Sequence, residues 1–217
     1  MIVDIHTHNK CPNGNHLSII NLSLEEAERI YSSKELGYFS CGIHPWVANE
    51  CNEEKHSALE KFLSDNRFIA VGECGLDKNS QSSMELQTYV FTKQILLSEK
   101  MQKPLIIHCV GCFNELLELK KHFKPLQQWI IHGFRGKPQL AKQLIKAGCG
   151  ISFGEHFNIE SLKITPVECL FIETDESLVS IELLYQKVAK IKNCRITSLN
   201  AGTNLITPNT IKIGKLL

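Results

Sequence analysis

The stretch Pro-Leu-Ile-Ile-His at residues 104–108 is the clearest sign of the fold. Its unbroken apolar run is typical of a strand buried on both faces, because a half-exposed strand would alternate apolar and polar residues. A helical pattern precedes it at residues 82–102, and another follows at residues 116–122. Strands that alternate with helices in this way indicate a parallel sheet covered by helices.

The same unit recurs along the whole chain. Eight apolar runs are predicted to be strands, at residues 2–6, 17–22, 38–43, 68–73, 104–108, 128–132, 149–153 and 169–173. Further helical patterns lie at residues 139–147 and 182–191, and Ser23 before Glu25 and Glu26 predicts a helix N-cap. Residues 154–168 are too few for a full-length helix, so we expect a trimmed crossover there.

Length and composition set the architecture that these units build. The chain has 217 residues, 43% hydrophobic and 22% charged, with no Ser/Gly-rich linker or low-complexity stretch. These values are ordinary for a globular protein and lie at the low end for a complete eight-stranded barrel. We therefore predict one domain over residues 1–217, a somewhat trimmed TIM-like (β/α)8 barrel of the α/β class.

Metal-binding residue types fall at or just after the predicted strand ends. The candidate ligands are His6, His8, Glu73, His108, His132 and Asp175. Residues two apart in an extended chain point to the same side, so His6 and His8 can share an ion. A single histidine closing an apolar strand is more often structural, but the repetition favours a metal site at the face where TIM barrels place their active sites.

Imidazole and carboxylate ligands together indicate one or two divalent ions. Zn²⁺, Mn²⁺ and Mg²⁺ are the candidates, and a carboxylate shared by two ions is typical of paired sites. Such ions lower the pKa of bound water toward neutrality. The sequence therefore predicts a metal-dependent hydrolase.

Seven ordered segments of the chain resemble the TatD-type metal-dependent deoxyribonuclease family, one of the amidohydrolase-like barrels. They are Asp4-Ile5-His6-Thr7-His8, Gly42-Ile43-His44-Pro45-Trp46, Val71-Gly72-Glu73-Cys74-Gly75-Leu76-Asp77, Ile106-Ile107-His108, His132-Gly133-Phe134-Arg135-Gly136, Ile172-Glu173-Thr174-Asp175, and Asn200-Ala201 with Leu205-Ile206. The matches run from the start of the chain to about residue 206. The last segment resembles the closing helix of the family.

The resemblance implies roles for the candidate residues. His6, His8 and Asp175 would hold one ion, His108 and His132 the other, and Glu73 would bridge them. Asp175 and Glu73 are the candidate catalytic groups, with Asp175 also accepting a proton by analogy with related barrels. The implied reaction is cleavage of DNA or another phosphodiester by water that the metal activates.

The sequence departs from the family pattern where substrate is expected to bind. Val110 stands where an arginine usually follows the Ile-Ile-His strand, and Lys78-Asn79 replaces an aromatic pair. Glu176-Ser177 replaces Ala-Pro, and the basic loop that normally follows is nearly absent. Two alternatives therefore stay open: an amidohydrolase or lactonase acting on a small molecule, and a metal-binding protein without turnover.

Several neighbouring residues have two interpretations each. His44 is predicted to contact substrate phosphate, against a structural role in the turn made by Pro45. Glu173 either orients a ligand histidine or forms a salt bridge at the rim. Arg135 either replaces part of the missing positive charge or is a solvated side chain, the favoured interpretation. Asp77 is expected to orient the Glu73 loop. Trp46 and Trp129 are expected to pack against other side chains rather than to act as base-stacking platforms. His16, His56, His122 and His156 are assigned no site role and are taken as surface or structural residues.

Charge and cysteine content limit the partners. A net charge of +1 gives no basic field for non-specific DNA binding, although metal ions would add local positive charge. The nine cysteines are read as reduced thiols, with Cys109 and Cys112 an incidental pair beside the site rather than a redox or zinc motif. No apolar run of transmembrane length and no leader-like start is recognised, so we expect a cytoplasmic protein with no membrane association and no obligate protein partner.

Overall fold

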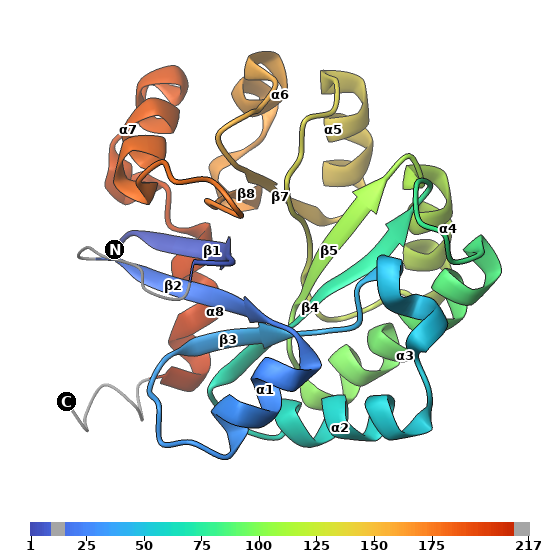
Figure 1. Ribbon diagram of the computed structural model, residues 1–217. Coiled ribbons are helices and arrows are strands. Elements are labelled where there is room, and N and C mark those ends of the chain that lie inside the picture. Colours follow the sequence, from blue (N-terminus) through green and yellow to red (C-terminus); the bar gives the residue numbers. More distant parts are fainter. Residues whose placement is uncertain (10–15, 211–217) are drawn as a thin grey trace.

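The computed structural model describes residues 1–9 and 16–210. Eight parallel strands pair in chain order, each with the next, and helices surround them (Figure 1). The strands are β1 (Val3–Thr7), β2 (Leu17–Leu22), β3 (Tyr38–Cys41), β4 (Phe68–Asp77), β5 (Leu105–Val110), β6 (Trp129–Ile131), β7 (Cys149–Phe153) and β8 (Leu170–Ile172). All eight strands expected from the sequence are confirmed.

The first and last strands approach each other without forming a full ladder. A single parallel bridge joins Thr7 to Asp175, just beyond β8. The amide of His8 donates to the carbonyl of Asp175 (3.0 Å), and the amide of Asp175 donates to the carbonyl of His6 (2.9 Å). The result is a nearly closed TIM-like (β/α)8 barrel, and the bridge that closes it lies among the candidate ligands.

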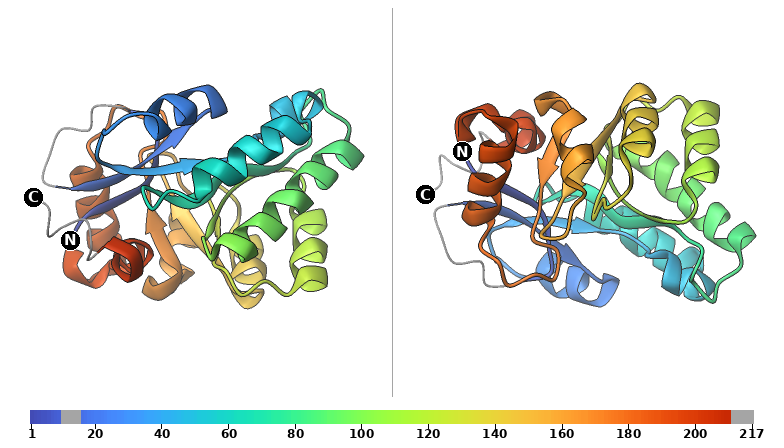
Figure 2. Two further views of the ribbon diagram at one scale, coloured as in Figure 1. Left: turned by 90° about the horizontal axis from the view of Figure 1, so that it is seen from below. Right: turned by 90° about the horizontal axis from the view of Figure 1, so that it is seen from above.

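Helices follow the strands around the outside of the barrel (Figure 2). They are α1 (Leu24–Tyr31), α2 (Glu53–Leu63), α3 (Met84–Met101), α4 (Phe113–Phe123), α5 (Pro138–Lys146), α6 (Ile159–Ile164), α7 (Ile181–Lys192) and α8 (Ala201–Thr210). The expected N-cap is confirmed, since the Ser23 side chain accepts from the amide of Glu26 in a capping box. The short α6 confirms the trimmed crossover, whereas no sequence pattern had predicted α2.

Apolar side chains pack on both faces of the sheet, which explains the unbroken apolar strands. In β5, Leu105 and Ile107 join the large core shared with the helices. Ile106, between them, belongs to a second cluster together with Ile130 and with Ala201 of α8. Trp129 is fully buried in the large core, as expected. No described helix is long and apolar enough to cross a membrane.

The fourth strand is longer than the sequence predicted. It continues past residue 73 to Asp77, so Glu73 lies inside β4 rather than at its end. The extension depends on Gly72 (φ 154°) and Gly75 (φ 139°), which adopt backbone conformations that side chains disfavour. A Cβ at Gly75 would overlap the carbonyl oxygen of His108, so glycine allows β4 to run close to β5. Glycine weakens most strands, which is why the sequence pattern ended this one too early.

Candidate metal centre

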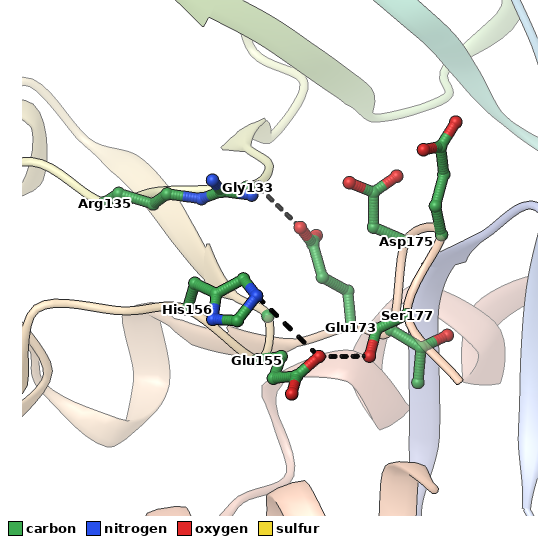
Figure 3. Close-up of a pocket in the computed structure, with 10 residues that line it drawn as sticks. Gly133, Arg135, Glu155, His156, Glu173, Asp175 and Ser177 are labelled. Carbon is green, nitrogen blue, oxygen red and sulfur yellow. Dashed lines mark hydrogen bonds and ion pairs between the residues drawn. The ribbon is translucent and has the colours of Figure 1, made fainter. Parts of the chain in front are cut away.

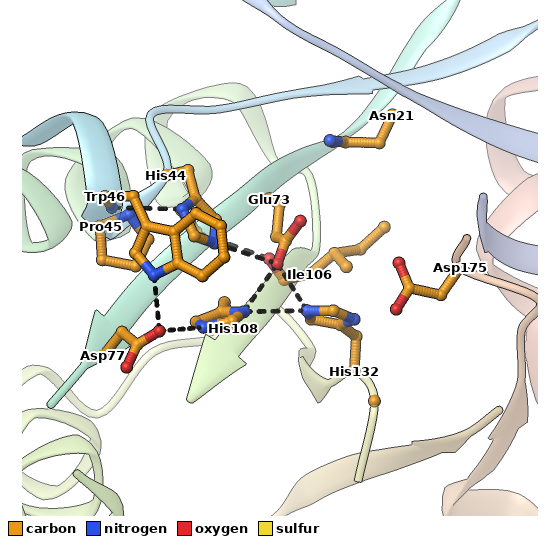
Figure 4. A network of polar contacts seen from close by, with 12 residues as sticks. Asn21, His44, Pro45, Trp46, Glu73, Asp77, Ile106, His108, His132 and Asp175 are labelled. Atoms are coloured by element: carbon orange, nitrogen blue, oxygen red, sulfur yellow. Dashed lines mark hydrogen bonds and ion pairs between the residues drawn. The ribbon is translucent and has the colours of Figure 1, made fainter. Parts of the chain in front are cut away.

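The barrel mouth brings all six predicted ligands together. His6 lies in β1 and His8 directly after it, while Glu73 and His108 lie in β4 and β5. The other two, His132 and Asp175, follow β6 and β8. Figure 4 shows Glu73, His108, His132 and Asp175 facing the same space. Three overlapping triplets could each hold an ion: His6, Glu73 and His132; His6, His8 and Asp175; His44, Glu73 and His108.

One oxygen of Glu73 faces the histidines of β1. Glu73 Oε2 lies 3.6 Å from His6 Nε2 and 3.7 Å from His8 Nε2. Asp175 Oδ1 lies 3.6 Å and 3.7 Å from the same two nitrogens. Two imidazole nitrogens and two carboxylate oxygens thus converge from three elements.

The other oxygen of Glu73 faces a second pair of histidines. Glu73 Oε1 lies 2.8 Å from His108 Nδ1 and 2.6 Å from His132 Nε2. The two ring nitrogens are 3.4 Å apart. Glu73 therefore faces one imidazole pair with each of its two carboxylate oxygens.

The donor set fits a divalent cation. Both ring nitrogens of His6 are buried and have no hydrogen-bond partner among the described residues, an arrangement that costs free energy unless a ligand contacts one of them. The spacing of 3.6–3.7 Å on this side is too long for hydrogen bonds. Two atoms each about 2.1 Å from a tetrahedral ion would stand about 3.4 Å apart, close to the observed spacing.

The pKa shifts of the clustered side chains also favour a bound cation. Burial by itself raises the pKa of the Glu73 carboxyl, but the surrounding imidazoles outweigh it and hold the pKa well below the usual range. Burial lowers the pKa of His132, and the carboxylates of Glu73 and Glu173 more than reverse this. The site thus attracts positive charge, and a metal ion would compete with protons for the same nitrogens.

Backbone contacts fix the position of Asp175. Its φ of 55° is left-handed, a conformation that aspartate tolerates better than most residues. The preceding residue, Thr174, donates its amide and its hydroxyl to the buried carboxylate of Asp4 (3.0 and 2.6 Å). Burial raises the pKa of Asp4 to about 7 despite these hydrogen bonds. Sequence reasoning gave Asp4 no role, although a carboxylate inside an apolar strand signals a buried polar contact.

His44 is oriented as a hydrogen-bond donor to the centre. Its Nδ1 accepts from the amide of Trp46 (3.2 Å), so the neutral ring carries its proton on Nε2. Nε2 lies 3.3 Å from Glu73 Oε1. With a proton on that nitrogen, His44 is better suited to contact an anion than to bind a metal.

Asp77 supports His108 rather than the Glu73 loop, so the sequence expectation was wrong about its partner. Asp77 Oδ2 lies 2.9 Å from His108 Nε2 and accepts from Trp46 Nε1 (2.7 Å). With a proton on Nε2, His108 presents the lone pair of Nδ1 to Glu73. The extension of β4 is what carries Asp77 to the next strand.

Trp46 is not packed in the interior, which also corrects an expectation. The residue is 61% exposed, and its ring lies beside His44 and His108. The 3-10 turn that follows His44 holds the indole at the surface. An apolar side chain in a turn gave no signal of this exposure.

Glu173 lies behind His132, completely buried. Its Oε1 is 3.5 Å from His132 Nδ1 and accepts from the amide of Gly133, while Oε2 has no hydrogen-bond partner. Burial favours the interpretation that Glu173 orients a histidine over a salt bridge at the rim. Glu173 and Asp175 line a hollow of about 220 Å³ together with the exposed Arg135. Figure 3 shows these side chains around the hollow.

The histidines that were assigned no site role lie outside the ligand cluster, although His156 lines the hollow beside Asp175. His16 pairs with Glu182 Oε1 (2.7 Å), whereas His122 and His156 are exposed. The cysteine pair Cys109 and Cys112 consists of buried free thiols, as do several other described cysteines.

A barrel with imidazoles and carboxylates gathered at the carboxyl ends of its strands defines the class of metal-dependent hydrolases. The family model of TatD related DNase matches residues 6–199 of this chain. The chain therefore belongs to the TatD family of metal-dependent hydrolases, and the resemblance seen in the sequence is confirmed.

Individual relatives agree with this membership. A protein of Cronobacter turicensis named 3'-5' ssDNA/RNA exonuclease TatD is 29% identical over 184 residues, 79% of this chain and 70% of the relative. An uncharacterized metal-dependent hydrolase of Buchnera aphidicola is 30% identical over 150 residues, 65% of this chain and 56% of the relative. The matched part thus spans 56–70% of the length of these two relatives.

Solved structures show the same fold. YJJV, a TatD homolog from Escherichia coli, superposes with a TM-score of 0.79 at 18% identity, covering 94% of this chain and 96% of that one. A hydrolase TatD family protein from Entamoeba histolytica gives a TM-score of 0.76 at 19% identity, with the same coverage.

Proposed function

We propose that this chain is a divalent-metal-dependent phosphodiesterase that removes nucleotides from single-stranded DNA or RNA. The observation that carries the proposal is Glu73, whose two oxygens each face a different pair of histidines. A carboxylate placed in this way suits two neighbouring cations, the arrangement used by many enzymes that cleave phosphodiesters. The name of the Cronobacter relative, an exonuclease of single-stranded DNA and RNA, supports the same substrate class.

The ligands divide into two sets. His6 Nε2, His8 Nε2 and Asp175 Oδ1 would hold one ion, and His108 Nδ1 and His132 Nε2 the other. Glu73 would serve both sets. Ions bound there supply water of lowered pKa and positive charge for the phosphate oxygens.

The protein's own side chains position the substrate and manage the proton. Asp175 is one-third exposed and reaches the open space of the mouth, where its carboxylate can accept a proton from the attacking water. His44, with its proton on Nε2, can donate to a phosphate oxygen. The buried carboxylate of Asp77 keeps His108 in a fixed orientation, and the buried carboxylate of Glu173 faces His132 Nδ1 at 3.5 Å.

The test uses metal-stripped protein that is given Mn²⁺, Mg²⁺ or Zn²⁺ and end-labelled single-stranded DNA or RNA. We expect the strand to shorten by single nucleotides, and His108→Ala to reduce kcat/KM by about 100-fold or more, since loss of a ligand exceeds the cost of losing a supporting group. His122→Ala, an exposed histidine on α4, is the matched control and should leave the rate unchanged. Hydrolysis of lactones or amides with no cleavage of DNA, RNA or a simple phosphodiester would contradict the proposal.

A further inference from the structure

An indole lies open beside the candidate metal centre. Trp46 is 61% exposed and lines a cleft of about 1100 Å³ that also contains His44, Glu73 and His108. Figure 4 shows its ring next to these side chains. An aromatic ring at the edge of a cleft offers a flat apolar face on which a ligand ring can stack.

The indole is held in a fixed orientation. Its Nε1 donates to Asp77 Oδ2 (2.7 Å), and Asp77 is buried and also faces His108. The backbone amide of Trp46 donates to His44 Nδ1 (3.2 Å). Because these hydrogen bonds already hold the Trp46 side chain, little additional side-chain entropy is lost when a ligand covers it.

The aromatic neighbours of the indole do not stack on it in parallel. His44 meets it at 85° with ring centres 4.9 Å apart, and His108 at 72° with centres 6.2 Å apart. Both are edge-to-face contacts rather than parallel stacks. Since the residue is 61% exposed, a flat ring that enters from the cleft can reach the indole.

The wall of the same cleft is acidic. Its charged lining residues on the side of α1 and α2 are Glu25, Glu26, Glu28, Glu50, Glu54 and Lys55. Lys55, the single cation among them, is paired with Glu50 at 3.0 Å. Such a wall repels phosphates, so a nucleic-acid strand must gain its affinity from other contacts.

We infer that Trp46 is a stacking platform for a nucleobase of a single-stranded nucleic acid whose neighbouring phosphate enters the metal centre. The inference rests on the proposed function and adds a specificity-determining residue to it. Stacking on an aromatic ring tolerates every base, because each base has a flat face. Metal ions and the indole would then replace the lysines and arginines that usually hold a strand.

Binding provides a direct test. The metal-loaded protein is titrated with a fluorescently labelled single-stranded oligodeoxythymidine whose terminal linkages are phosphorothioates to resist cleavage, and with the same strand made abasic at its 3′ end. We expect Trp46→Ala to weaken binding of the intact strand by about 5- to 100-fold and to leave binding of the abasic strand unchanged. Trp46→Phe should retain most of the affinity, and Trp46→Leu should not.

Fluorescence gives a second readout that does not depend on activity. The chain has two tryptophans, and Trp129 is fully buried, so quenching by a bound strand reports on Trp46. The intact strand should quench this emission and the abasic strand should not. Tyr89→Ala, which removes a ring that is 53% exposed on α3 outside the cleft, is the control and should change neither readout.

The outcomes separate this inference from the proposed function. If DNA and RNA are cleaved but Trp46→Ala binds intact and abasic strands as the wild type does, the platform is refuted and the phosphodiesterase stands. If no metal supports cleavage but base-dependent binding and quenching are seen, the platform stands and the activity is refuted. If Trp46→Ala loses the circular dichroism spectrum of the folded protein, Trp46→Leu replaces it. The platform is then refuted if Trp46→Leu binds the intact strand and the abasic strand as tightly as the wild type does.

Discussion

Asp77 is the side chain whose replacement gives the sharpest test of the centre. Its Oδ1 accepts from the amide of Asn79 (2.8 Å), and its Oδ2 accepts from Trp46 Nε1 and faces His108 Nε2. These hydrogen bonds hold the pKa of Asp77 below its usual range even though burial raises it. Asp77 is therefore an anion that keeps the proton of His108 on Nε2.

Asp77→Asn preserves the shape of the side chain and removes this preference. An amide accepts at one end only, so keeping the bond from Asn79 turns the NH₂ group toward His108 Nε2. The imidazole must then carry its proton on Nδ1, where it blocks the lone pair that faces Glu73. The opposite orientation places the NH₂ group against the amide of Asn79, so the variant loses a contact either way.

The expected magnitude follows from the loss of a supporting carboxylate. Replacing such a group costs about 10- to 100-fold in metal affinity, or about 1.4–2.7 kcal/mol. Isothermal titration of the metal-free protein with Zn²⁺ or Mn²⁺ measures this change. Glu182→Gln removes a carboxylate from the remote pair with His16 and should leave metal affinity unchanged. Equal metal affinity in Asp77→Asn and wild type would refute the assigned role of His108 Nδ1.

Three further predictions concern stability. Gly75→Ala places a Cβ against the carbonyl oxygen of His108, at a residue whose φ is 139°. We therefore expect the free energy of unfolding measured in urea to fall by about 2 kcal/mol or more. A variant as stable as the wild type would contradict the close approach of β4 and β5. Burial raises the pKa of the Cys149 thiol to about 11, so the neutral thiol's contribution to the free energy of unfolding is fully present below pH 9, the ordinary thiol value, and is lost between pH 9 and 11. Over this window the wild type should lose about 2–3 kcal/mol more in free energy of unfolding than Cys149→Ala. Parallel pH profiles of the two proteins would refute this prediction. Saturation of the centre with Zn²⁺ or Mn²⁺ at about 100 times Kd should stabilise the fold by about 2.7 kcal/mol and raise Tm by about 5–11 °C in a thermal scan, whereas identical Tm values with metal and with chelator would mean that the centre does not bind the ion.

The sequence by itself determined the barrel, the order of its strands and the membership of the family. Unbroken apolar runs such as residues 104–108 must be buried on both faces, and eight such runs alternating with helices leave few architectures open. It also supplied the six candidate ligands, because the carboxyl ends of parallel strands meet at one rim.

The tertiary structure alone decided how those ligands are supported and what stands beside them. The sequence pattern ended β4 at Glu73, two residues before Gly75, whereas in the structure the strand passes through Gly75 and continues to Asp77. The partners of Asp77, and the open indole of Trp46, depend on contacts between segments more than 30 residues apart. Periodicity reports on a strand's own burial and cannot report such contacts, because they form only when separate strands and turns pack at the barrel mouth.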